Sequence, residues 1–276
     1  MSKPEFRASS LNLLKVCPAF AEITKSAPQI ETDAMQRGTA MHAAIADYYA
    51  TPANNRQVPT NEDMARAVEN LSVYDEVLDF SDGAFEREWK VERPVYTLTG
   101  HTDWFRYDEK AKVMRIVDFK TGAGFTLPPL DTDYQMAAYA VMASYHHDCE
   151  RVLVYRVPTD YATKPDDVTK EYRQSDLGYF REQIDAICDM ARVRLSDTGT
   201  RVVPRACVGH HCTYCPSWRG CEKYLKSPDA TMGPLDIDGA GDWGFIAWKL
   251  SAYKRKIAYL EDKIEDHARG NHVEFD

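Results

Sequence analysis

The sequence predicts an α/β protein whose central mixed β-sheet is flanked by helices. Two observations along the 276 residues lead to this expectation. Helical patterns come first, a run of strand-like segments follows, and a helix–strand–helix series comes next. Apolar residues make up 44% of the chain and charged residues 28%, a balance typical of a globular domain with a sizeable core.

The individual elements follow from apolar periodicity, caps and breakers. Ser9 or Ser10 can open the first helix, and Asp33 is a plausible cap for the second. Strand segments are rich in β-branched and aromatic residues. The expected helices are 9–24, 33–50, 62–80, 131–147, 176–195 and 242–268, and the expected strands are 84–92, 95–105, 112–119 and 150–157.

The composition and charge of the chain indicate where the protein is located and what it can bind. The sequence contains no apolar run long enough to span a bilayer, and its N-terminus lacks the apolar stretch of a secretory signal. We therefore expect a cytoplasmic protein without membrane contact. A net charge of −9 argues against a broad nucleic-acid-coating surface, but it permits local basic stripes beside metal-binding carboxylates.

A candidate metal site lies at the end of the segment 113–120. Side chains alternate along a strand, so Asp118 and Lys120 share one face. If the preceding strand pairs with this segment as a hairpin, Asp103 approaches Asp118. Two carboxylates are hard oxygen ligands for Mg²⁺ or Mn²⁺, and a nearby lysine can stabilise developing charge. Taken alone, an ordinary surface Asp–Lys pair would be the better interpretation.

Further candidates lie on two helices and on the strand of Asp103. Gln135 and Tyr139 are four residues apart and therefore share a helix face, which would otherwise be an ordinary packing face. His42 lies near the start of an apolar helix, where a lone histidine is more often structural. His101 shares the strand face of Asp103 and is a rival metal ligand.

Seven cysteines, an odd number, argue against a disulfide framework in a reducing compartment. Cys212 and Cys215 form a Cys-x-x-Cys pair that can chelate one metal centre, and Cys221 follows closely. A fourth ligand must come from elsewhere, and Cys17 is the first candidate. A zinc site completed by Cys207, His210 or His211 is the alternative.

Three short motifs containing these candidate residues follow one another along the chain. They are Gly100-His-Thr-Asp103, Ile116-Val-Asp-Phe-Lys-Thr-Gly122 and Gln135-Met-Ala-Ala-Tyr139. In this order the chain resembles the RecB-like branch of the PD-(D/E)XK nuclease superfamily. The resemblance implies a restriction-endonuclease-like core, metal binding by His42, Asp103 and Asp118, catalysis by Lys120, and supporting or substrate-binding roles for Gln135 and Tyr139.

The cysteine arrangement resembles the iron–sulfur subgroup of these nucleases, which includes CRISPR-associated exonucleases. One cysteine before the core and three after it imply a [4Fe–4S] cluster held by Cys17, Cys212, Cys215 and Cys221. Such a cluster would clasp the two ends of a nuclease domain spanning 1–225, together with its helical region. Residues 226–241 are then a linker, and residues 242–276 form an amphipathic helix and tail.

The terminal helix carries an apolar seam with a heptad pattern, formed by Trp243, Ile246, Leu250, Tyr253, Ile257, Leu260 and Ile264. We expect it to pack on the nuclease body. A homo-oligomer or a protein partner bound through this helix is the alternative.

The resemblance implies a metal-dependent DNA exonuclease that acts on single-stranded ends in repair, recombination, phage or CRISPR DNA processing. A nuclease-like fold that binds DNA or a partner without cutting is one alternative. A zinc-clasped assembly protein is another.

Overall fold

The computed structural model describes residues 3–26, 33–121, 128–196, 198–213, 215, 221–225 and 243–271. The chain divides into two compact units, each described by itself below. Unit 1 comprises residues 1–12 and 31–192, and unit 2 comprises residues 13–30 and 193–276. The boundaries 1–225, 226–241 and 242–276 stay a prediction, and the expected linker 226–241 lies outside the described residues.

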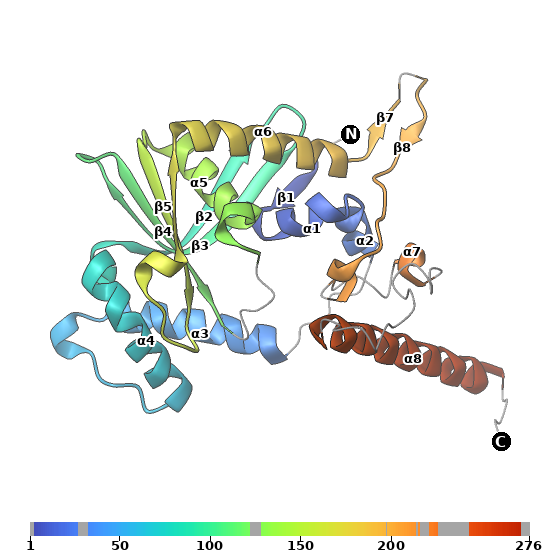
Figure 1. The fold of residues 1–276 in the computed structure, drawn as a ribbon, viewed down its shortest axis with the longest axis horizontal. Helices are drawn as coiled ribbons and strands as arrows, with labels where there is room; N and C mark the ends of the chain where they lie inside the picture. Colours follow the sequence, from blue (N-terminus) through green and yellow to red (C-terminus); the bar gives the residue numbers. More distant parts are fainter. Residues whose placement is uncertain are drawn as a thin grey trace. The chain divides into compact units, whose positions relative to one another are not determined.

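Unit 1 contains a mixed sheet with helices on both faces, as the sequence predicts. Figure 1 shows α5 and α6 on one face of the sheet, and α3 and α4 on the other. Its strands are β1 (Glu5–Arg7), β2 (Ala84–Glu92), β3 (Thr97–Asp108), β4 (Val113–Lys120), β5 (Arg151–Pro158) and β6 (Thr169–Arg173). Its helices are α3 (Asp33–Ala50), α4 (Glu62–Leu78), α5 (Tyr134–His146) and α6 (Gln174–Ala191).

Strand β3 pairs with three other strands of the sheet. One of its edges pairs along most of its length with antiparallel β2. Its other edge is shared by parallel β1, at Thr97–Thr99, and antiparallel β4, at Trp104–Asp108. The order of neighbours continues through β5, parallel to β4, to β6, antiparallel to β5. The expected hairpin of the Asp103 and Asp118 strands is therefore confirmed.

Local signals explain where the helices begin and end. The Asn61 side chain accepts a hydrogen bond from the Met64 backbone N–H and caps α4, and Asp79 ends the helix in the left-handed region with φ 51°. Asp133 caps α5 by accepting hydrogen bonds from the backbone N–H groups of Gln135 and Met136. These caps place the start of α5 at Tyr134 rather than at residue 131.

Apolar faces of α3 and α4 cover one side of the sheet. Ile45 and Leu71 are fully buried there against Val117 and Phe119 of β4. On the other side, α5 packs between the sheet and α6, and the rings of Tyr134 and Phe180 lie 5.9 Å apart. Strand β4 is thus covered on both faces.

The elements of unit 2 are α2 (Phe20–Ser26), β7 (Arg194–Leu195), β8 (Arg201–Val202), α7 (Glu222–Leu225) and α8 (Trp243–Asn271), and α1 (Leu11–Val16) joins the two units. The single helix expected over 9–24 was wrong, because it is interrupted at Cys17-Pro18. Proline lacks the N–H that a helix needs and disfavours helical geometry in the residue before it.

Apolar residues of the expected heptad seam lie on the long helix α8. On α8, Leu250, Ile257, Leu260 and Ile264 are between 50% and 57% exposed, and the expected packing of this seam on the nuclease body stays a prediction.

None of the helices in the described ranges has the length and apolar character needed to cross a bilayer.

Candidate active site

The candidate site lies where two strand ends approach one another on the same edge of β3. Arg7 ends β1 opposite Thr99, and Val117 of β4 is opposite Trp104. The β3 residues between these two positions, Gly100–Asp103, are therefore flanked by the ends of both strands. Asp118 and Lys120 complete β4 beside this opening, and Asp103 lies within it.

The two carboxylates that the sequence identifies as candidates, Asp103 and Asp118, are both buried. Asp103 is 6% exposed and Asp118 is 4% exposed. The backbone N–H of Phe119 donates a hydrogen bond to Asp103 Oδ2, which ties the two strands together. His42 of α3 lies with Nδ1 3.0 Å from Asp103 Oδ1. The structure thus joins His42 and Asp103, which are far apart in the sequence.

Lys120 and the α5 side chains surround Asp118. The Lys120 Nζ atom lies 2.6 Å from Asp118 Oδ2, and Gln135 Nε2 donates to Asp118 Oδ1 at 3.1 Å. Tyr139 donates to the same Oδ1 over a longer distance of 3.4 Å. Gln135 also donates to the Tyr139 hydroxyl at 2.8 Å and accepts from Lys120 at 3.4 Å. Gln135 and Tyr139 therefore support Asp118 and Lys120.

Burial and charge perturb the titration of this cluster. Burial strongly opposes a charge on Lys120, but the nearby Asp118 and Asp103 carboxylates outweigh it and raise the pKa of the ammonium. Burial likewise lowers the pKa of His42, and Asp103 and Asp118 reverse this to a net increase. Burial raises the pKa of the Tyr139 hydroxyl far above its usual value, so it remains a neutral donor.

The carboxylates of this site favour a bound cation. Asp118 Oδ2 is buried, and its neighbour within the described part of the chain is the Lys120 ammonium, 2.6 Å away. Burial raises the pKa of Asp118 even with Lys120 beside it, so a negative charge on this carboxylate is costly and an additional cation would stabilise it. The carboxylate and imidazole donors also suit Mg²⁺ or Mn²⁺. No three His, Cys, Asp or Glu side chains of the described ranges are already arranged at metal-binding spacing.

The other strand histidine has a different neighbour. His101 Nε2 lies 3.2 Å from Glu86 Oε2, and the histidine side chain is 51% exposed. Glu86 has a φ of 59°, an uncommon backbone conformation for a non-glycine residue within a strand. His101 thus faces an exposed carboxylate on β2, and the structure gives it no contact with Asp103.

Three positioning residues escaped the sequence analysis. Asp133, 1% exposed, forms an ion pair with Arg156 of β5 at 2.7 Å and accepts a hydrogen bond from Asn12 at 2.9 Å. Asn12 in turn accepts a hydrogen bond from the Tyr134 backbone N–H. This network fixes the first turn of α5, which carries Gln135. An aspartate directly before a helix is a cap signal, but nothing local in the sequence identifies its two partners.

Unit 2 contains a second candidate centre. Cys17, Cys207, Cys212, Cys215 and Cys221 line one small cavity together with His211. The backbone N–H groups of Cys207 and Gly209 point at the sulfur atoms of Cys17 and Cys212, each at 3.5 Å. Burial raises the pKa of the Cys17 thiol, and the Cys207 N–H opposes this without outweighing it. The gathering of several thiols in one cavity, with N–H donors aimed at two of them, fits a thiolate-bound metal or cluster.

The remaining two cysteines, Cys149 and Cys188, are buried in unit 1, as expected for small apolar residues. Burial raises the pKa of the Cys149 thiol to about 11 and that of the Cys188 thiol to about 12. Both thiols therefore stay protonated at neutral pH, and both lie outside the cysteine-lined cavity.

Two solved structures are weakly similar to this chain. A Eubacterium rectale protein provisionally named an exonuclease has 13% identity and a TM-score of 0.41, with 73% of this chain and 90% of that chain covered. A phage-related exonuclease of Haemophilus somnus has 14% identity and a TM-score of 0.30, with 68% and 93% covered. Similarities this weak carry no argument of their own. No curated protein matches the sequence significantly.

The model of the PD-(D/E)XK nuclease superfamily matches residues 62–222. This range includes both carboxylates, the lysine and the start of α5. Because the match covers more than half of the sequence, the chain belongs to the PD-(D/E)XK nuclease superfamily.

Proposed function

We propose that this protein is a Mg²⁺- or Mn²⁺-dependent DNA exonuclease that hydrolyses phosphodiesters at single-stranded ends. The observation behind the proposal is the convergence of Asp103, Asp118 and Lys120 at one opening in the sheet, with His42 beside them. The nuclease family supports hydrolysis of nucleic acid. The preference for single-stranded DNA ends follows from the resemblance to RecB-like exonucleases.

Each side chain has a defined task in this proposal. Asp103, Asp118 and His42 would hold the metal, which when bound activates water and neutralises phosphate charge. Lys120 places a positive charge beside Asp118, where it can stabilise charge that develops on the phosphate. Gln135 keeps both Asp118 and Lys120 in position through one hydrogen bond to each.

Two cavities leave room for a nucleic acid beside these residues. A cavity of about 400 Å³ includes Tyr139, and a cavity of about 760 Å³ includes Met41 and Thr121, the neighbours of His42 and Lys120 in the sequence. The larger cavity combines apolar side chains with Arg37 and Arg66 and with the carboxylates of Asp63 and Asp160.

We further propose that Cys17, Cys212, Cys215 and Cys221 bind a [4Fe–4S] cluster. The gathering of these thiols in one cavity of unit 2 and the N–H donors aimed at two sulfurs support this assignment. The cluster would act as a clasp within unit 2, and zinc at the same cysteines is the alternative.

Cleavage of DNA labelled at the 5′ or the 3′ end, with and without Mn²⁺, tests the main proposal. We expect single-stranded DNA to be shortened from an end only when Mn²⁺ or Mg²⁺ is present, and we expect Lys120→Ala to abolish this activity. Lys110→Ala, at the distant turn between β3 and β4, is the control and should cleave normally. Binding without cleavage, or cleavage that survives Lys120→Ala, would contradict the proposal.

A further inference from the structure

The short strand β1 fixes an arginine beside the candidate active site. Phe6 and Ala8, on either side of Arg7, are 3% and 0% exposed. Arg7 itself points outward, and its backbone pairs with Thr99 of β3. The buried neighbours and the backbone pairing with β3 hold the base of the Arg7 side chain in place, so binding a ligand would have to order only the side chain itself.

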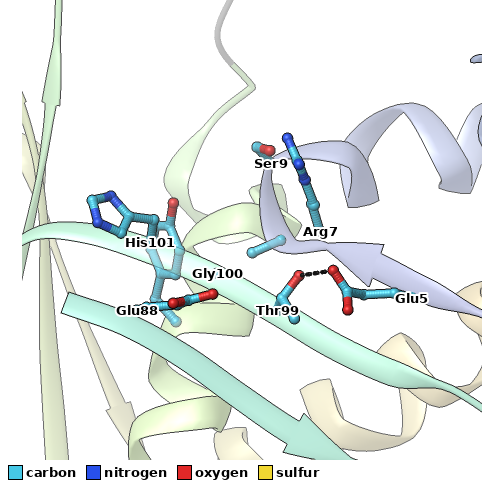
Figure 2. Close-up of a pocket in the computed structure, with 9 residues that line it drawn as sticks. Glu5, Arg7, Ser9, Glu88, Thr99, Gly100 and His101 are labelled. Carbon is cyan, nitrogen blue, oxygen red and sulfur yellow. Dashed lines mark hydrogen bonds between the residues drawn. The ribbon is translucent and has the colours of Figure 1, made fainter. Parts of the chain in front are cut away.

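Arg7 lies on the wall of the cavity of about 400 Å³ that Figure 2 shows. The same cavity includes Tyr139, whose hydroxyl reaches Asp118. Its floor is close-packed, because a Cβ atom at Gly100 would lie 2.4 Å from Met142 Cε and 3.0 Å from the Tyr139 ring. Through Tyr139 the cavity adjoins Asp118, and glycine at position 100 lets Met142 and Tyr139 pack closely against β3.

The charges inside the cavity are separated. Figure 2 shows the Arg7 guanidinium directed toward Ser9 and away from the carboxylates of Glu5 and Glu88. Glu5 accepts a hydrogen bond from Thr99 at 3.5 Å. Within the part of the chain that is described, Arg7 makes no ion pair and no side-chain hydrogen bond. A guanidinium without a partner, beside a hydroxyl, is suited to an anion with several acceptor oxygens.

We propose that Arg7, together with the Ser9 hydroxyl, binds a backbone phosphate of the substrate strand and positions that strand for cleavage. This inference rests on the proposed nuclease function. Thr99, opposite Arg7, precedes Asp103 by four residues of β3, a separation on the order of 13 Å. Arg7 therefore binds a phosphate near the scissile one rather than the scissile phosphate itself. Glu5 and Glu88 repel phosphate and confine it to the side of the cavity that Arg7 and Ser9 form.

Binding of a fluorescent single-stranded oligonucleotide tests this role without cleavage. The full chain carrying Lys120→Ala serves as the parent, and anisotropy is measured over a series of salt concentrations. We expect Arg7→Ala to weaken binding about tenfold and to reduce the slope of log K against log salt by about 0.7, the value for one phosphate contact on a single strand. Arg7→Lys keeps the charge and should restore the slope.

Arg151→Ala is the matched control, because Arg151 is an exposed arginine opposite Val113, at the far end of β4 from Lys120. It should leave both affinity and slope unchanged. If Arg7→Ala behaves like Arg151→Ala while the parent binds, this inference fails and the proposed function stands. If the parent binds no DNA and the wild-type chain cuts none, both fail.

Replacing single phosphates of the oligonucleotide by uncharged methylphosphonates identifies the contact. We expect one position near the scissile bond at which neutralisation weakens binding to the parent but has no further effect on Arg7→Ala. Equal losses in the two proteins at every position would overturn the assignment. A thermal melt of each variant shows whether the exposed substitution at Arg7 has left the fold intact.

Discussion

The two oxygens of Asp118 have different environments. Oδ1 accepts hydrogen bonds from Gln135 and Tyr139, whereas Oδ2 lies 2.6 Å from the Lys120 ammonium. The α5 helix therefore fixes the orientation of the carboxylate from one side, and Lys120 pairs with it from the other. Preorganisation of this kind is worth most in a buried site, where electrostatic interactions are poorly screened.

Gln135 and Tyr139 should contribute unequally to activity. Gln135 contacts both Asp118 and Lys120, so Gln135→Ala should lower kcat about 10- to 100-fold, the usual effect of losing a residue that orients a metal ligand. Tyr139→Phe removes the longer bond to Asp118 and the hydroxyl that accepts from Gln135, but leaves both contacts of Gln135 with Asp118 and Lys120, and should cost less than tenfold. Steady-state cleavage of labelled DNA measures both. A Tyr139→Phe defect as large as that of Gln135→Ala would contradict this ranking.

Among the elements, β1 and β4 share one edge of β3 and leave an opening between their ends. Arg7 from β1, and Asp118 and Lys120 from β4, lie at these strand ends near Asp103. Helix α5 completes the arrangement from one face, and its position depends on the buried Asp133–Arg156 ion pair. A catalytic site on such elements is held more precisely than one on loops.

The attachment of α6 to the β2–β3 turn gives a pH-dependent contribution to stability. Arg93 Nε donates to Asp185 Oδ1 at 3.0 Å, and the Tyr96 hydroxyl donates to the same atom at 2.6 Å. Burial raises the pKa of Asp185, but these hydrogen bonds and the Arg93 charge outweigh it and lower the pKa below its usual value. The stabilisation is therefore complete above the ordinary carboxyl pKa and is lost as pH falls through the lowered value.

Asp185→Asn should consequently destabilise the protein by about 0.5–1 kcal/mol at pH 7, a modest loss because the pair is partly exposed. At pH 3 the difference from the wild type should shrink, since the wild-type carboxyl is then losing its charge. Urea unfolding at the two pH values measures this change. A gap of equal size at pH 7 and pH 3 would show that the charge on Asp185 is irrelevant.

In the molecule as a whole, the two candidate sites lie in different units. Unit 1 contains the carboxylates and lysine, and unit 2 contains the cysteine-lined cavity. Cys17 lines this cavity together with cysteines that are nearly two hundred residues away in the sequence. A metal centre there would close a long loop of the chain, which restricts the unfolded state more than a short closure does.

Cys17→Ser should release the cluster and loosen unit 2. We expect anaerobically purified wild-type protein to contain iron and acid-labile sulfide in equal amounts, and the variant to contain little of either. Limited proteolysis of the variant should become faster in residues 193–276. Cys149→Ala is the control, because that buried thiol lies outside the cavity. Wild-type protein that contains zinc and no iron would contradict the [4Fe–4S] assignment.

The sequence by itself determined the order of the main elements and most of the candidate site. Helices, strands and caps leave local periodic patterns, so α3 and β2 have the bounds that these patterns predict. The pairing of Asp118 with Lys120 on one strand face is likewise a local consequence of alternation. The cysteine spacing indicated a metal centre, because ligand chemistry restricts which residues can form one.

Only the tertiary structure decided how distant segments complete these patterns. Strand β1 is three residues long, too short for a periodic signal, yet its pairing with β3 brings Arg7 beside the site. The same holds for Asp133 and Arg156, and for His101, which faces Glu86. Such contacts depend on which segments meet after chain closure and on the register of the sheet, and neither leaves a mark in a local stretch of sequence.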